Sequence, residues 1–234
     1  MPDWHILKFD EVASTQDLAK EQARAGAAEG TVIVAKAQTA GRGRNGNSWE
    51  TLGGNLLSSI LLRPPVEVAQ FGLYSFMIAV ALNRALNEYL EEPHSILNKW
   101  PNDVLVDTRK IAGILLEIEE DALIVGIGVN IASAPADRIC LHQVSRERVK
   151  VADFLHVLLA NIAAVLAEFD RDGFDGIREE WLDHAANLHQ KIVAKLPHGS
   201  FEGVFEGLDT DGALRLRLAN GEIKVIHSGE IFFG

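Results

Sequence analysis

Two arginines lie among three glycines in residues 41–49, which read GRGRNGNSW. Each arginine presents a planar fork of N–H donors that matches a phosphate or a carboxylate. Glycine lets the backbone approach a ligand closely and adopt left-handed angles. Arg42 and Arg44 therefore predict a pliable loop that binds an anion, although a Gly/Arg-rich surface turn or an RNA-binding patch would have a similar composition. Other segments must decide between these interpretations.

Three further segments follow along the chain. They are residues 99–104 (KWPNDV), 109–117 (RKIAGILLE) and 126–131 (GIGVNI). In this order and at these spacings, the four segments resemble the biotin protein ligases, also called biotin–[acetyl-CoA-carboxylase] ligases. The resemblance extends over nearly the whole chain, because Ser14 and Thr15 near the start and residues 211–230 near the end also match.

The resemblance implies a two-step activity. The biotin carboxylate attacks the α-phosphate of ATP to give biotinyl-5′-adenylate and pyrophosphate, and a lysine of a biotin carboxyl carrier protein then attacks the mixed anhydride. ATP would arrive with Mg2+, so no dedicated metal site is expected. Members of the family often dimerise through exposed sheet edges, which allows a homodimer.

The first of these steps brings two anions together and requires fixed positive charge. Two like charges ~4 Å apart repel by roughly 4 kcal/mol at an effective dielectric constant of about 20. By the resemblance, Lys99 contacts both the biotin carboxylate and the α-phosphate, while Arg42 and Arg44 lie on a loop that folds over the adenylate. We therefore expect these three side chains to be catalytic through positioning and charge, without covalent chemistry.

The resemblance also assigns binding residues. A biotin ureido ring needs donors and acceptors in an otherwise apolar pocket. The positions that match biotin contacts are Ser14, Thr15, Gln38, Gly41, Arg42, Lys99, Gly113, Ile114 and Gly128. Those that match ATP or adenylate contacts are Arg42, Arg44, Trp49, Asn102, Lys110 and Asn130.

Three positions depart from the commonest family pattern. Asn45 and Asn47 stand where basic residues are usual or frequent, and Gln16 replaces a more frequent asparagine. The loop therefore has two fewer positive charges. The departure bears on the strength of pyrophosphate binding and on how tightly the adenylate is retained, and the sequence leaves both open; Arg42 and Arg44 remain for the main contacts.

Composition restricts the class of protein. The chain has 234 residues, 47% hydrophobic and 24% charged, which is typical of a folded protein. Its formal net charge of −11 argues against nonspecific binding to nucleic acid or acidic membranes. The single cysteine, Cys140, and a start without a leader pattern predict a cytoplasmic protein. The longest apolar run, residues 71–82, is too short to span a membrane.

Hydrophobic periodicity predicts the elements that position these residues. A turn is expected at Asn102–Asp103, and Ser14 is expected to cap a helix. Strands are predicted over residues 4–9, 31–37, 55–62, 97–100, 110–118 and 122–131. Further helices are predicted over residues 68–90, 151–169 and after Gly176.

From about residue 190 the pattern changes to short alternating strands, with an Asn220–Gly221 hairpin signal. We therefore predict an α+β fold in two domains. Residues 1–188 would form a mixed-sheet catalytic domain of the biotin/lipoate protein ligase type, similar to class II aminoacyl-tRNA synthetases. Residues 189–234 would form an SH3-like β-barrel that docks on it and helps to form the site. Because the chain starts at the catalytic strand, we expect a single-function ligase without an N-terminal DNA-binding domain.

Two alternatives remain open. A lipoate or octanoate protein ligase shares the fold and the acyl-adenylate chemistry, but it would favour a longer, wholly apolar tunnel. A non-catalytic biotin-adenylate sensor is the alternative of another class, suggested by the two asparagines of the loop. The presence of Lys99, Arg42 and Arg44 weighs against a sensor.

Two metal-like patterns carry little weight. Asp209-X-Asp211-Gly212 resembles the start of a calcium loop, but the later ligands are absent, so a hairpin turn is expected. The eight histidines lack the spacing of a structural zinc site.

Overall fold

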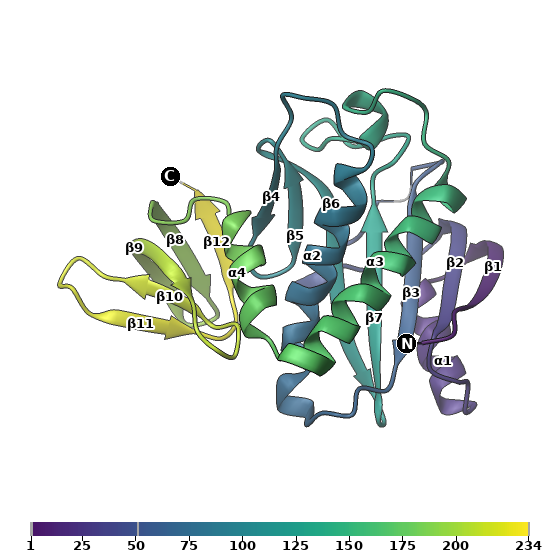
Figure 1. The fold of residues 1–234 in the computed structure, drawn as a ribbon, viewed down its shortest axis with the longest axis horizontal. Helices are drawn as coiled ribbons and strands as arrows, with labels where there is room; N and C mark the ends of the chain where they lie inside the picture. Colours follow the sequence, from purple (N-terminus) through teal and green to yellow (C-terminus); the bar gives the residue numbers. More distant parts are fainter. Residues whose placement is uncertain (1, 51, 234) are drawn as a thin grey trace.

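The computed structural model describes residues 2–50 and 52–233. Seven of its strands form a mixed sheet in the order β1-β2-β3-β7-β6-β5-β4 (Figure 1). β1 and β2 are parallel, and every other neighbouring pair is antiparallel. The strands are β1 (His5–Val12), β2 (Thr31–Gln38), β3 (Leu56–Leu62), β4 (Ile96–Lys99), β5 (Asp103–Val106), β6 (Arg109–Glu119) and β7 (Ala122–Val129).

Helices cover both faces of this sheet. α1 (Thr15–Arg24) lies on one face, where Ala19 and Ala23 pack against Ile33 and Leu61. α2 (Tyr74–Asn87) lies against β4, β5 and β6 on the opposite face, with α3 (Val151–Asp172) beside it (Figure 1). Nearly every residue of α2 is buried, because the sheet, α3 and α4 (Asp175–Asp183) surround it. The face that carries α1 is therefore the one with room for a ligand.

The helix predicted over residues 68–90 is wrong in its bounds. Val68–Leu73 form a 3-10 helix (η2), and the α-helix begins only at Tyr74 and ends at Asn87. Gly72 lowers the helix propensity at the start, since glycine loses much backbone entropy in a helix. At the other end, Leu90 forms a β-bridge with Ser145.

The turn predicted at Asn102–Asp103 is also shifted. Asp103 begins β5, which pairs with β4 on one side and β6 on the other. A strand of four residues is too short to show a clear alternation of polar and apolar side chains. The helix expected after Gly176 begins slightly earlier, at Asp175.

Among the helices of the described ranges, only α3 is long and apolar enough to cross a membrane by length and composition. Its buried side chains, such as Phe154, Leu158 and Ile162, belong to the main hydrophobic core, and the helix packs on α2. Core packing therefore explains its hydropathy.

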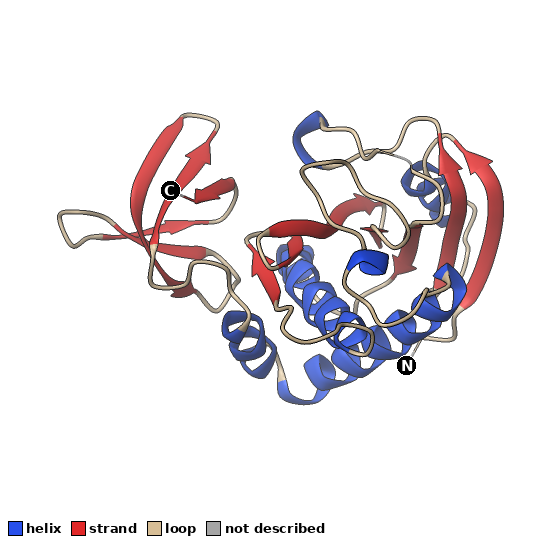
Figure 2. Ribbon diagram, turned by 90° about the horizontal axis from the view of Figure 1, so that it is seen from above, coloured by secondary structure: helices blue, strands red, loops and turns tan. Residues whose placement is uncertain are grey.

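The C-terminal strands form a separate antiparallel sheet (Figure 2). Their order is β11-β10-β9-β8-β12. They are β8 (Lys191–Leu196), β9 (Gly199–Leu208), β10 (Leu214–Arg217), β11 (Ile223–Ile226) and β12 (Glu230–Phe233). Leu214 and Leu216 are buried, as their alternation with Arg215 and Arg217 predicts. The predicted α+β fold with a small C-terminal β-domain is confirmed.

This small domain contacts the catalytic domain next to the KWPNDV segment. Trp100 Nε1 donates a hydrogen bond to the carbonyl oxygen of Gly212 at 3.1 Å. A Cβ on Gly212 would lie 2.5 Å from Cε2 of Phe76, so only glycine allows this approach. Gly212 N–H also donates to Asp209 O at 3.0 Å, which closes the expected hairpin turn. The contact brings β12 close to Lys99.

Candidate active site

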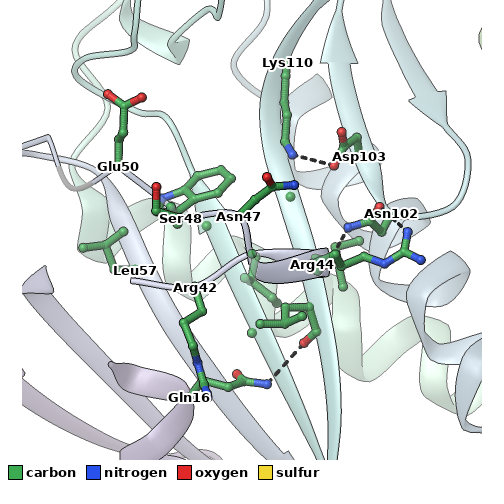
Figure 3. A pocket seen from close by; sticks show the side chains of 18 of the residues that line it. Gln16, Arg42, Arg44, Asn47, Ser48, Glu50, Leu57, Asn102, Asp103 and Lys110 are labelled. Carbon is green, nitrogen blue, oxygen red and sulfur yellow. Dashed lines mark hydrogen bonds and ion pairs between the residues drawn. The ribbon is translucent and has the colours of Figure 1, made fainter. Parts of the chain in front are cut away.

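Small residues leave a hollow on the α1 face of the sheet. Ile124 of β7 packs beneath α1, and the next positions on the same face are Gly126 and Gly128. Ser59 of β3 and Gly113 of β6 are their cross-strand partners. Beyond the first turn of α1, these residues line a cavity of about 420 Å³ (Figure 3).

The structure brings all the predicted site residues to this cavity except Gly41 and Asn130. Gly41 does not line the cavity. It packs against two residues that do, since a Cβ on Gly41 would be 2.7 Å from Trp49 O and 3.0 Å from Gln38 Nε2. Asn130 is buried, and its Nδ2 donates to Ile139 O at 3.2 Å. The predicted residues that do line the cavity are Ser14, Thr15, Gln38, Arg42, Arg44, Trp49, Lys99, Asn102, Lys110, Gly113, Ile114 and Gly128.

One end of the cavity, which we call the neutral end, consists of hydroxyls and amides from Ser14, Thr15, Gln16, Gln38 and Ser59. The Thr15 N–H and hydroxyl both donate to Gln38 Oε1, at 2.7 and 3.1 Å. Ser59 Oγ lies 2.9 Å from both Thr15 Oγ1 and Gln16 Oε1. Ser14 Oγ accepts the Gln16 N–H at 3.2 Å and caps α1, as predicted. The network offers fixed donors and acceptors to an uncharged polar ring.

Gln16 and Ser59 belong to this end although neither was among the predicted contacts. Gln16 Nε2 donates to Ile124 O at 3.2 Å, and a Cβ on Gly126 would lie 2.7 Å from Gln16 Oε1. Gly126 therefore makes room for the glutamine amide. A signal for this end was present, since Ser58 and Ser59 interrupt an otherwise leucine- and isoleucine-rich strand that is buried throughout.

The arginine loop, residues 41–49, is folded as a short hairpin. Arg42 and Ser48 form an antiparallel bridge, and Gly43 N–H donates to Asn47 O at 2.7 Å. Asn45 at the tip has a φ of 54°, in the left-handed region that asparagine tolerates. Uncharged Asn45 and Asn47 are thus compatible with an ordered loop.

The two arginines of the loop have different surroundings. Arg42 Nη2 pairs with Asp17 Oδ1 at 2.5 Å and Glu117 Oε2 at 3.2 Å, and it points toward Gln16 (Figure 3). Arg44 Nη1 donates instead to the neutral Asn102 Oδ1 at 3.1 Å. Burial lowers the pKa of the Arg44 guanidinium, while the charges of Asp103 and Glu230 act in the opposite direction. Arg44 remains charged and has no carboxylate hydrogen-bonded to it among the described residues.

Trp49 lies flat against a glycine wall. A Cβ on Gly128 would be 2.5 Å from Trp49 Cε2, and a Cβ on Gly113 would be 3.0 Å from Trp49 Cζ3. Glycine at both positions is therefore required by the ring. Trp49 Nε1 is buried and has no hydrogen-bond partner within residues 2–50 and 52–233. The indole N–H is therefore a buried donor without a partner in this arrangement of the ring.

The two lysines of the cavity take different positions. Lys110 Nζ pairs with Asp103 Oδ1 at 2.6 Å and lies 5.5 Å from the centre of the Trp49 ring (Figure 3). Lys99 Nζ lies 5.5 Å and 5.4 Å from the rings of Phe232 and Phe233 in β12. Lys110 is thus held at the glycine wall, whereas Lys99 is held at the junction with the C-terminal domain.

Three charged residues that line the cavity come from outside the four motif segments: Glu50, Arg138 and Glu230. Arg138 reaches it from the segment between β7 and the short 3-10 helix η3 (Leu141–Gln143), and Glu230 from the start of β12. Nothing in the spacing around Arg138 indicates its position, because an irregular segment has no periodicity. We call Arg44, Lys99, Lys110 and Arg138, with Trp49, the charged end of the cavity.

A neutral hydrogen-bonding end joined to a charged end, on a mixed sheet of this topology, defines a ligase of the biotin and lipoate type. Comparison with known proteins agrees with this class. The biotin/lipoate A/B protein ligase family matches residues 9–131, and the C-terminal domain of biotin protein ligases matches residues 189–234. The chain belongs to the biotin/lipoate A/B protein ligase family and, within it, to the biotin protein ligases.

Individual relatives support this assignment. A biotin–[acetyl-CoA-carboxylase] ligase of Paracoccus denitrificans is 37% identical over 86% of this chain and 90% of its own length. The bifunctional ligase/repressor BirA of Bacillus subtilis is 33% identical over 98% of this chain and 74% of its own length. The biotin protein ligase of Aquifex aeolicus, solved in complex with biotin and ATP, has a TM-score of 0.85 at 31% identity, over 97% of both chains. The prediction of a ligase is confirmed, and neither alternative is favoured.

Proposed function

We propose that the chain activates biotin with ATP and then transfers it to a lysine of a biotin carboxyl carrier protein. The observation that carries this proposal is the continuity of the cavity, whose neutral end leads directly to its charged end. An uncharged ureido ring fits the neutral end. The biotin carboxylate and the α-phosphate of ATP would then meet at the charged end.

In the first step, a carboxylate oxygen attacks the α-phosphorus, and the bond from that phosphorus to the bridging oxygen breaks. Pyrophosphate leaves with the electron pair, and biotinyl-5′-adenylate remains. Negative charge accumulates on the transferred phosphoryl oxygens, so nearby cations in a water-poor cavity stabilise this transition state. The protein supplies charge and alignment, and no side chain forms a covalent bond.

Lys110 is the better candidate to contact both reacting groups, and Lys99 a flanking cation. Lys110 Nζ would be 3.1 Å from a Cβ on Gly113, so it lies against the cavity wall beside Trp49. Lys99 instead contacts the two phenylalanines of β12. On this position we propose the bridging role for Lys110, although it is paired with Asp103 and the resemblance assigned the role to Lys99. Comparison of a methionine variant of each lysine separates these assignments.

Arg42 is already paired before a ligand binds. It contacts two carboxylates, Asp17 and Glu117. A guanidinium can give one edge to a carboxylate and another to an anionic ligand, because its donors form a fork. We propose that Arg42 binds the adenylate in this way while the arginine loop covers the anhydride and excludes water.

In the second step, the uncharged amine of the carrier lysine attacks the biotinyl carbonyl. A C–N bond forms, the bond from the carbonyl carbon to the phosphate oxygen breaks with its electron pair on that oxygen, the nitrogen gives up one proton to solvent, and AMP leaves. The lysine side chain is long and thin, so it can enter a cavity that stays closed to larger nucleophiles. β12 lies at the entrance beside Lys99, which supports a role for the C-terminal domain in receiving the carrier.

Magnesium would arrive with the ATP phosphates. Among the residues that the structure describes, no group of three or more His, Cys, Asp or Glu side chains could hold a metal ion. Asp103 is already paired with Lys110. We also propose a cytoplasmic location, where ATP and carboxylases are present. A homodimer through an exposed sheet edge stays a prediction.

The proposal is tested by the intact mass of a biotin carboxyl carrier domain after incubation with the chain, ATP and Mg2+. Biotin and lipoate are offered in separate reactions. The expected result is a biotin-sized increment that depends on ATP. Attachment of lipoate alone would overturn the assignment of the neutral end, and binding of biotin without attachment would favour the sensor.

A further inference from the structure

The segment between β7 and η3 contributes a cation to the cavity. The Arg138 side chain is partly buried and lines the cavity, with Cζ 5.4 Å from the centre of the Trp49 ring. Within the described ranges, its guanidinium makes no hydrogen bond and no ion pair; only its backbone N–H is bonded, to Pro135 O at 3.0 Å. The donors of this guanidinium are therefore free to bind an anionic ligand in the cavity.

The backbone that carries Arg138 is held by the burial and the hydrogen bonds of its neighbour, Ile139. Its neighbour Ile139 is fully buried, and the Ile139 N–H donates to Lys110 O at 3.1 Å. The Ile139 carbonyl accepts a hydrogen bond from the buried Asn130 Nδ2 at 3.2 Å. The segment is therefore tied to the strand that carries Lys110, and Trp49 has Lys110 and Arg138 both within 5.5 Å of its centre. The backbone next to Arg138 is thus held in place by hydrogen bonds, as a residue that supports a binding site requires.

The ion pairs around the cavity indicate the class of ligand that Arg138 binds. Arg42 is paired with two carboxylates and Lys110 with one, so each has part of its charge compensated within the protein. The tip of the arginine loop contributes only the uncharged Asn45 and Asn47. ATP brings several negative charges, and biotin brings one. Arg44, Lys99 and Arg138 have no carboxylate partner among the described residues, and three such cations suit the nucleotide phosphates better than the single charge of biotin.

We propose that Arg138 is an ATP-binding residue that contacts the leaving diphosphate, with Asn130 as the positioning residue that holds its segment. The inference rests on the proposed function, because it assumes that ATP is the nucleotide. A bidentate guanidinium suits a phosphate better than an ammonium does. Once the diphosphate has left, Arg138 contributes little to holding the adenylate.

The test uses pyrophosphate release by the full chain with Arg138→Ala and Arg138→Lys. We expect Arg138→Ala to raise KM for ATP about 10- to 100-fold, the range for a lost charge-assisted hydrogen bond. Inhibition by added inorganic pyrophosphate should weaken by a similar factor. KM for biotin and the affinity for preformed biotinyl-5′-adenylate should stay within about twofold of the unmodified chain. Arg138→Lys should recover part of the effect, since it keeps the charge and loses the fork.

The control is Arg148→Ala, which removes an exposed arginine from the region that follows η3. An unchanged KM for ATP in Arg138→Ala would overturn the inference. So would an equal loss of affinity for biotinyl-5′-adenylate, because it would assign Arg138 to the adenylate and not to the leaving group. Failure of the proposed function is distinguishable, since the unmodified chain would then release no pyrophosphate with biotin and ATP.

Discussion

The two ends of the cavity are held in different ways. At the neutral end, Thr15, Gln38 and Ser59 bond to one another, so their geometry is set before any ligand arrives. At the charged end, Arg44 donates only to a neutral amide, and the Trp49 indole N–H has no partner among the described residues. The neutral end is suited to recognition of a ring. The charged end has hydrogen-bond donors without a charged partner, and it is suited to charges that develop during reaction.

The largest expected effect concerns the two lysines of the cavity. We expect Lys110→Met to reduce the rate of adenylate formation about 100- to 1000-fold, the range for loss of a positioned electrostatic group. Lys99→Met should reduce it less, because its ammonium lies beside Phe232 and Phe233. Biotin-dependent pyrophosphate release measures both, with exposed Lys36→Met as a control. A larger loss for Lys99→Met would return the bridging role to Lys99.

At the neutral end, Thr15→Val should raise KM for biotin by roughly 10-fold, since Gln38 and Ser59 each lose a hydroxyl partner. KM for ATP should be unchanged. Steady-state kinetics with each substrate varied in turn measures the split. Equal increases in both KM values would show that the valine disturbs the whole cavity and that the two ends are not separate.

A smaller effect is expected from Arg44→Gly. The variant should still form the adenylate but release it several-fold faster, because the contact between the arginine loop and Asn102 is lost. Free biotinyl-5′-adenylate would then modify bystander lysines. Mass spectrometry of a bystander protein in the reaction detects this labelling. Absence of labelling with normal pyrophosphate release would contradict a retaining role for the loop.

The smallest effect on the site is expected from a substitution among the helices α2, α3 and α4, on the face of the sheet opposite α1. Arg84 of α2 bonds to Glu168 of α3 at 2.8 Å and Glu180 of α4 at 2.6 Å. These groups are partly exposed, so we expect Arg84→Met to lower the free energy of unfolding by only about 1 kcal/mol, with both KM values unchanged. Chemical denaturation measures the loss, and a shift in either KM would mean that the layer and the site are coupled.

The same network predicts a dependence on pH. The hydrogen bond from Arg84 holds the pKa of Glu168 below its usual range. A carboxyl whose pKa is lower in the folded state contributes stability above its unfolded pKa and loses it as the pH falls through its folded pKa. The unmodified chain should therefore lose more stability than Arg84→Met on acidification below about pH 4, the unperturbed range for glutamate. Parallel losses in the two proteins would contradict this assignment.

The sequence predicted the charged end better than the neutral end. Arg44, Lys99 and Lys110 lie in dense motifs, and the structure brings them to one cavity. Gln16 and Ser59 reach the neutral end through cross-strand neighbours, such as the pairing of Ser59 with Gly126, and pairing depends on a register that local sequence does not encode.

Other residues escaped prediction for a different physical reason. Arg138 lies in an irregular segment whose course is set by hydrogen bonds from Asn130 and to Lys110. The four-residue strand β5 is fixed by its two neighbours and has too few residues for a pattern. Long periodic elements such as α3 were predicted nearly to their ends, because their own side-chain spacing specifies them.

The most direct test of the division into two ends is a double-mutant cycle with Thr15→Val and Arg44→Ala, measured as KM for biotin and KM for ATP in pyrophosphate release. Thr15 and Arg44 share no hydrogen-bond partner among the described residues. The account predicts that Thr15→Val changes only KM for biotin, that Arg44→Ala changes mainly KM for ATP, and that the double variant shows the product of the single effects, within about 0.5 kcal/mol. A coupling well above that value, or a Thr15→Val effect on ATP as large as that on biotin, would contradict it.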